Sequence, residues 1–134
     1  MNMNHKYKLL IFDWDGTLSD SVSRIVHSIQ AAATEHDLEV PTFDEAANII
    51  GLGLKEAIIK LFPEADNLLV AKITASYSDS YRIKDAGPSD FFPYALDTLC
   101  KLKAEGYKLA VATGKSRAGL NRAFKASDID DLFH

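Results

Sequence analysis

One stretch of the sequence decides the fold: Tyr7-Lys8-Leu9-Leu10-Ile11-Phe12-Asp13-Trp14-Asp15-Gly16-Thr17-Leu18. Its residues 9–12 are bulky and apolar without alternating polar residues, which is typical of a strand buried on both faces of a parallel sheet. Asp13 and Asp15 follow directly, so they fall at the carboxyl end of this strand. In open α/β sheets, ligands bind outside the carboxyl ends of the strands. The stretch therefore predicts an α/β fold with a site at its two acids.

The composition is that of an ordinary globular protein. The 134 residues are 47% apolar and 25% charged, which suits one domain or one domain with an insertion. The net charge of −4 argues against nucleic-acid binding. Apolar runs are too short for a membrane span or a secretory signal, so we expect a cytoplasmic protein. Cys100, the only cysteine, excludes an internal disulfide and is expected to be a small core residue.

The first half of the chain after the opening stretch predicts helices. Apolar residues recur at helical spacing in four segments, which cover about residues 20–36, 42–50, 54–62 and 66–82. Ser19 and Asp20 offer a cap for the first segment. Thr42 and Glu45 form a capping box for the second, and Pro63 ends the third.

The second half returns to an α/β pattern. A loop over residues 84–92 leads to a helix from about Pro93 that Gly106 should end. A second short buried strand follows at 108–112 and runs into Thr113 and Gly114, after which Ser116 can cap a last helix. The long helical connection predicts that the two strands are parallel. The expected layout is an α/β core of residues 1–19 and 85–134, with a helical insertion of residues 20–84.

The two acids can hold different roles because they lie in different surroundings. One can stay ionised as a nucleophile or a ligand of a hard metal, while the other serves as general acid and then base. Gly16 allows a sharp turn that exposes backbone amides to an anion. Oxygen ligands without thiolates or imidazoles favour Mg²⁺. At the second strand end, the Thr113 hydroxyl and the amides of Gly114 and Lys115 are expected to cradle a phosphate.

These motifs resemble those of the haloacid dehalogenase-like (HAD) hydrolases. The resemblance rests on an apolar strand followed by Asp-x-Asp-Gly-Thr-Leu, a helical insertion, and an apolar strand that ends in Thr-Gly. The run from Phe12 to Ser21 is especially similar to the phosphoglycolate phosphatase-like branch, whose helical cap takes the place of residues 20–84. The resemblance covers nearly the whole chain and implies a partial Rossmann-like parallel sheet with an inserted cap domain.

The resemblance also implies roles for individual residues. Asp13 would be the nucleophile that forms an aspartyl-phosphate and would also bind Mg²⁺. Asp15 would protonate the leaving alcohol and then activate water, and its backbone carbonyl would reach the metal. Gly16, Thr113 and Gly114 would bind the phosphoryl group. The cap loop at Leu54 and Lys55 would contribute to substrate choice.

The sequence departs from the family pattern beyond residue 114. A lysine that steadies phosphate and nucleophile, and a later acidic motif that completes the magnesium shell, cannot be placed before His134. Lys115 follows Thr113 too closely to be that lysine, and it is read with Arg117 as a solvated helix start. We therefore expect a C-terminally truncated chain whose first strand has an open apolar edge that favours self-association.

Other site assignments compete with simpler ones. Tyr77 and Tyr81 could face a substrate, but aromatic residues at helical spacing more often build a core. Trp14 lies between the acids and could line the crevice or pack behind it; the sequence does not decide.

The leading function is a magnesium-dependent phosphatase of small phosphorylated metabolites, with phosphoglycolate one candidate. Two alternatives stay open: a catalytically inert fragment or oligomerising module, and a sugar-phosphate mutase with the same motifs. A dehalogenase is disfavoured because it does not need the second acid.

Overall fold

The chain divides into two compact units. The computed structural model describes residues 6–84 and 91–134. One unit comprises Met1–Asp20 with Pro88–His134, and the other comprises Ser21–Gly87. Most of the predicted loop at 84–92, including the predicted domain boundary at residue 85, lies outside the described residues.

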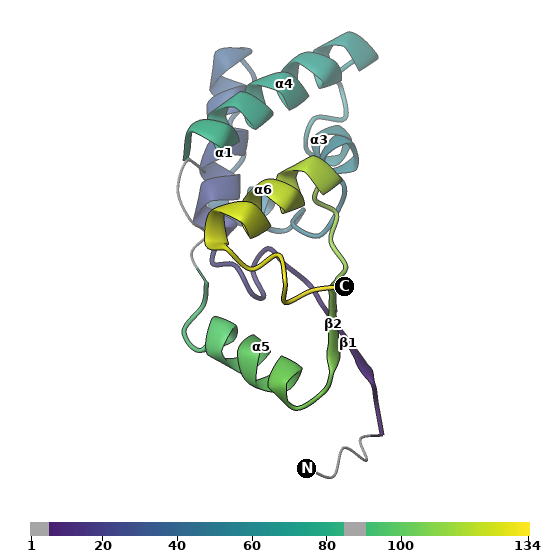
Figure 1. Ribbon diagram of the computed structural model, residues 1–134. Coiled ribbons are helices and arrows are strands. Elements are labelled where there is room, and N and C mark those ends of the chain that lie inside the picture. The colour runs from purple at the N-terminus through teal and green to yellow at the C-terminus, as the bar shows by residue number, and fades with distance from the viewer. Residues whose placement is uncertain (1–5, 85–90) are drawn as a thin grey trace. The chain divides into compact units, whose positions relative to one another are not determined.

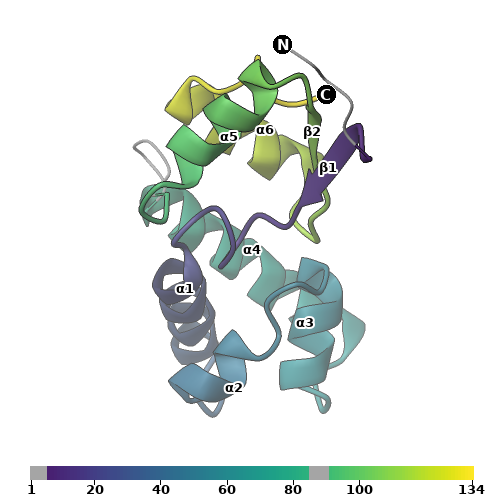
Figure 2. The same cartoon turned by 90° about the horizontal axis from the view of Figure 1, so that it is seen from below.

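A two-stranded parallel sheet forms the centre of the first unit. Strand β1 (Leu9–Phe12) pairs with β2 (Lys108–Val111), from Leu9 opposite Lys108 to Phe12 opposite Val111. The predicted parallel pairing is thus confirmed. Helices α5 (Ala95–Ala104) and α6 (Arg117–Ser127) lie on the same side of the two strands in both views (Figures 1 and 2).

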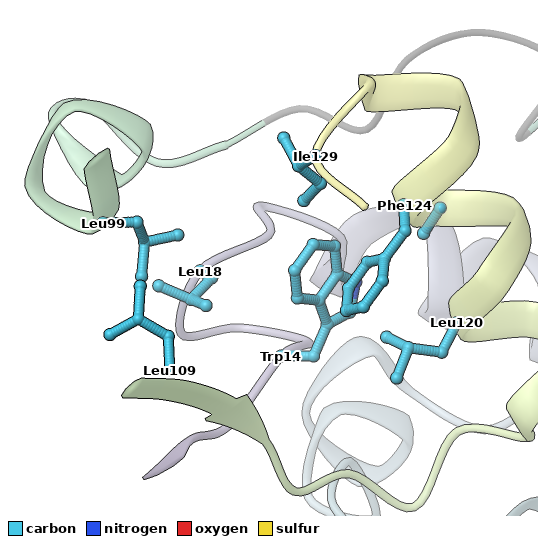
Figure 3. Close-up of a cluster of buried hydrophobic side chains, with 8 residues drawn as sticks. Trp14, Leu18, Leu99, Leu109, Leu120, Phe124 and Ile129 are labelled. Atoms are coloured by element: carbon cyan, nitrogen blue, oxygen red, sulfur yellow. The ribbon is translucent and has the colours of Figure 1, made fainter. Parts of the chain in front are cut away.

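The core of this unit forms between those helices and one face of the sheet. Its most buried members are Trp14, Leu18, Leu99, Leu109, Leu120, Ala123, Phe124 and Ile129. The Trp14 ring meets Phe124 edge to face, with 5.4 Å between ring centroids. Figure 3 shows this ring among the side chains of Leu18, Leu120, Phe124 and Ile129. Trp14 therefore packs behind the acids, which answers the question that the sequence left open.

Burial of β1 on both faces was a wrong prediction for this chain. Successive side chains of a strand point to opposite faces. Leu10 and Phe12 pack against the core, whereas Leu9 and Ile11 on the other face are 48% and 62% exposed. Because α5 and α6 both cover the same face, the apolar run is only half buried.

The core position predicted for Cys100 was also wrong. Its neighbour Leu99 is fully buried against the sheet, and Cys100 is exposed. Consecutive helical residues point about 100° apart, so the residue after Leu99 turns away from the core.

The end of the chain approaches the other edge of β2. The side chain of Phe133 stacks on Phe124 with ring centroids 5.0 Å apart. The backbone N–H of His134 then donates to the carbonyl of Leu109 at 2.7 Å. Residues Lys108 and Ala112 use their amides for β1, so the tail meets the edge of β2 that faces away from β1.

The described part of the second unit, residues 21–84, contains four helices. These are α1 (Val22–Glu35), α2 (Phe43–Ala47), α3 (Leu54–Leu61) and α4 (Asn67–Lys84). Helices α1 and α4 lie side by side (Figure 1). Two buried clusters hold the unit together, one centred on Val26, Ala46 and Ala57 and the other on Ala33, Ile58 and Ile73. Each cluster draws residues from at least three helices, so no helix is packed on one neighbour alone.

The predicted helix ends of this unit are partly correct. The Thr42 hydroxyl accepts a hydrogen bond from the Glu45 amide at 3.2 Å, which confirms Thr42 as the N-cap; the Glu45 carboxylate accepts from the Thr42 hydroxyl and not from its backbone amide, so only half of the capping box forms. Helix α1 begins at Val22, and its N-cap position is taken by Ser21 and not by the predicted Ser19 or Asp20. In residues 6–84 and 91–134, no helix has the length and apolarity needed to cross a bilayer.

Candidate active site

The acids lie in a loop that is tied together by its own backbone. The carbonyl of Trp14 accepts from the amides of Thr17, Leu18 and Ser19 at 3.0–3.1 Å. The Gly16 amide donates to the Ser19 carbonyl at 2.8 Å. Gly16 has a φ of 79°, which few residues with side chains adopt. Because Trp14 is only 1% exposed, the closed loop is anchored in the core below it.

Asp13 is held by two neutral donors from the same loop. Its Oδ1 accepts from the Trp14 backbone N–H at 2.8 Å, and its Oδ2 accepts from the Thr17 hydroxyl at 3.3 Å. The residue as a whole is exposed. The carboxylate is thus oriented on both oxygens while its outer side stays open to a reactant.

Thr17 is a site residue that the sequence reading missed. The signal was present, since Thr17 belongs to the same Asp-Gly-Thr motif as the acids. What the sequence alone does not give is that the loop folds back far enough for the hydroxyl to reach Asp13, four positions earlier.

The loop after β2 begins at the same edge of the sheet. The Ala112 amide donates to the Phe12 carbonyl at 2.8 Å, so the ladder runs to the residue before Asp13. The Lys115 amide donates to the Thr113 hydroxyl oxygen at 3.1 Å. A hydroxyl oxygen that accepts a bond can still donate its own proton. Thr113 therefore keeps a donor for a phosphate, whereas the Lys115 amide is bound to Thr113 and its use in the cradle stays a prediction.

Lys115 connects the two loops. Its Nζ lies 4.0 Å from Oδ1 of Asp15, and the two side chains are only 12% and 13% exposed. The reading of Lys115 as a solvated helix start was therefore wrong. The contact joins residues a hundred positions apart and brings the loop after β2 to the second acid.

The remaining predicted site residues are Gly16, Gly114, Leu54 and Lys55. Gly16 and Gly114 are both exposed residues, but the Gly16 amide donates to the Ser19 carbonyl at 2.8 Å, so its contact with a phosphate stays a prediction. Leu54 and Lys55 form the first turn of α3, in the second unit; Lys55 is exposed and Leu54 packs on the apolar cluster. Their contact with a substrate stays a prediction.

The tyrosines of α4 belong to the core of their unit. Tyr77 and Tyr81 stack with centroids 5.8 Å apart, and Tyr81 is buried. The guanidinium of Arg24 lies 5.7 Å from the Tyr81 ring centroid. Their packing thus fits a role in the core better than contact with a substrate.

The donor set of the acid loop fits a hard divalent cation. Asp13 and Asp15 offer oxygen only, and Mg²⁺ is commonly bound by one or two carboxylates together with waters and substrate phosphate. Across the described ranges, no group of three or more His, Cys, Asp or Glu side chains is suitably gathered. Asp13 and Asp15 can therefore supply part of the protein's share of such a site.

The α/β unit has a parallel sheet with paired acids at a strand end, and a helical segment interrupts its sequence. These features are typical of a class of phosphoryl-transfer and related hydrolytic proteins. The sequence profile described as "Haloacid dehalogenase-like hydrolase" matches residues 10–134. The chain belongs to this family.

Individual relatives agree with this membership. The chain is 30% identical to a phosphoglycolate phosphatase from Agrobacterium fabrum over 93% of its own length. It is 31% identical to the tyrosine-protein kinase PtkA of Mycobacterium tuberculosis over 94% of its length. A crystal structure titled as a predicted phosphoglycolate phosphatase from Haemophilus somnus superposes with a TM-score of 0.82 at 27% identity and covers 97% of the chain.

The chain spans only part of these relatives. It covers 59% of the Agrobacterium phosphatase, 42% of PtkA and 61% of the Haemophilus structure.

Proposed function

We propose that the whole protein is a magnesium-dependent phosphatase of small phosphorylated metabolites that acts through an aspartyl-phosphate. The observation that carries the proposal is the pair of acids after β1, each with its own partners. Asp13 is oriented by the Trp14 amide and the Thr17 hydroxyl, and Asp15 lies beside Lys115. Two acids in different surroundings are suited to the separate roles of nucleophile and proton carrier. A phosphatase is also what the Agrobacterium relative is named.

The reaction divides into two steps. In the first, an Asp13 carboxylate oxygen bonds to phosphorus, the bond from phosphorus to the alcohol oxygen breaks, and Asp15 gives its proton to the leaving alcohol. In the second, Asp15 takes a proton from water as the water oxygen attacks the same phosphorus. The bond to Asp13 breaks, and inorganic phosphate leaves. The Thr113 hydroxyl and the Gly114 amide would hold the phosphoryl oxygens.

Asp13 and Asp15 would also hold Mg²⁺. When bound, the ion offsets the repulsion between the phosphate and the two carboxylates. The positioning of the acids is the contribution of the chain itself, and positioning with charge stabilisation is most of what phosphoryl transfer requires.

The test is phosphate release by the whole protein from a panel of phosphorylated metabolites that includes phosphoglycolate. Asp13→Asn should lower the rate about a thousandfold or more. Asp20→Asn, at an exposed acid outside the loop, is the matched control and should change little. Absence of phosphate release across the panel would count against the proposal, whereas transfer between hydroxyls of one sugar without phosphate release would indicate a mutase.

A second candidate concerns the 134-residue chain alone. It could be a catalytically inert, self-associating module, and the observation in favour is the exposed apolar pair Leu9 and Ile11 on β1. Turnover by the isolated chain at the rate of the whole protein would contradict inertness. A cytoplasmic location stays a prediction from the sequence.

A further inference from the structure

Hydrogen bonds hold the backbone around Lys115, the cation beside Asp15. Lys115 lies directly before Ser116, the N-cap of α6, whose hydroxyl accepts from the Gly119 amide at 3.1 Å. Its own amide is bound to the Thr113 hydroxyl at 3.1 Å. The backbone of Lys115 is therefore fixed from both sides, by the turn that starts at Thr113 and by the helix cap.

The lysine stem is also supported along its length. A Cβ placed on Gly119 would lie 3.2 Å from the Ser116 hydroxyl oxygen, and 3.4 Å and 3.5 Å from Cγ and Cε of Lys115. The stem of Lys115 therefore lies over Gly119 at ordinary contact distance. The tight approach is to the Ser116 cap, which gives Gly119 a reason to be there although glycine weakens a helix interior.

The Lys115 ammonium lies beside Asp15, whereas neutral groups donate hydrogen bonds to Asp13. The Lys115 Nζ lies 4.0 Å from Oδ1 of Asp15, whereas the oxygens of Asp13 accept from the Trp14 amide and the Thr17 hydroxyl. A charge pair with about one-eighth of each side chain exposed is less screened by solvent than a pair on the open surface. The Asp15 carboxylate is therefore attracted towards the loop after β2.

We propose that Lys115 is a positioning residue for Asp15. The ammonium pairs with the ionised form of Asp15, which takes a proton from water in the second step, and keeps it in the geometry that this proton transfer needs. This inference rests on the proposed phosphatase function.

The kinetic test compares Lys115→Met, Lys115→Arg and the control Lys101→Met, an exposed lysine of α5, in the whole protein. Lys115→Met should lower kcat about tenfold or more with KM little changed, because Asp15 and not substrate binding is affected. Lys115→Arg should recover most of kcat, because it keeps the charge. Unchanged kcat in Lys115→Met, or a raised KM with normal kcat, would overturn the proposal; the second result would assign Lys115 to substrate binding.

A second measurement does not depend on activity. Lysine side chains of the same protein are labelled with acetic anhydride, and the rate at each site is followed by mass spectrometry. Asp15→Asn should speed labelling of Lys115 several-fold, while Asp13→Asn should leave it unchanged. Equal labelling rates in wild type and Asp15→Asn would overturn the positioning role. If the wild-type protein releases no phosphate, the proposed function fails while this arm still decides whether Asp15 holds Lys115.

Discussion

Different groups orient the two acids of the strand-end loop. The Thr17 hydroxyl is the one that a single substitution can remove with little change in side-chain shape. Thr17→Val keeps the shape of the side chain but takes away the hydroxyl that donates to Oδ2 of Asp13 at 3.3 Å. A hydrogen bond of this kind contributes about 1 kcal/mol, which corresponds to about fivefold in rate. We expect kcat for phosphate release to fall by that factor in the whole protein.

Thr17→Ser is the control for this change, because it keeps the hydroxyl. It should retain most of the rate, and urea unfolding of both variants should stay within about 1 kcal/mol of wild type, since the bond is solvent-exposed. Equal kcat in Thr17→Val and wild type would show that the Trp14 amide alone is enough to orient Asp13.

For single residues, the sequence predicted their positions after a strand better than it predicted contacts between residues far apart in the chain. It placed Asp13 and Asp15 after a strand, because an apolar run that ends in acids is a local pattern, and it predicted the turn at Gly16 for the same reason. The ion pair of Lys115 with Asp15 joins two loops that only the pairing of β1 with β2 brings together. No spacing along the chain carries that information.

Among the elements, α2 depends most on its cap. It has five residues, too few to persist by hydrogen bonding alone. Thr42 accepts from the Glu45 amide at 3.2 Å and lies 3.0 Å from the Glu45 carboxylate. Thr42→Ala should lower the free energy of unfolding by about 1 kcal/mol. Urea denaturation measures this, and amide hydrogen exchange should rise within α2.

The matched variant is Thr42→Ser, which keeps the capping hydroxyl and should change stability by a few tenths of a kcal/mol. Loss of stability in both variants to the same extent would assign the effect to the Thr42 methyl group and not to the cap.

Element positions were predictable where one face of a helix carries the apolar residues. Helix α3 begins at Leu54 as expected and ends at Leu61, next to the predicted end. Ser116 caps α6, and Gly106, with a φ of 98°, follows the end of α5. The failures share one cause: burial of β1 on both faces and of Cys100 depends on which elements pack against them, and an apolar run or a helical spacing does not specify this.

At the scale of the whole molecule, the two units are built from the chain in different ways. Unit Ser21–Gly87 is contiguous and builds its own buried clusters, whereas the α/β unit is assembled from two separate segments. The helical insertion therefore leaves the pairing of Leu9–Phe12 with Lys108–Val111 intact. Its separate core explains how a long excursion can lie between the acids and the second strand of their sheet.

The uncovered face of β1 leads to a prediction about association. Leu9 and Ile11 point away from α5 and α6, and Ile11 is 62% exposed. Exposed apolar side chains on a short sheet favour pairing with another copy. The isolated 134-residue chain should therefore form dimers or larger species as its concentration rises, and Ile11→Lys should shift it to monomer, as measured by sedimentation velocity. Leu68→Lys is the matched control, because Leu68 is equally apolar and 65% exposed but lies on α4. A wild-type chain that stays monomeric, or an equal effect of the two lysines, would show that this face does not drive association.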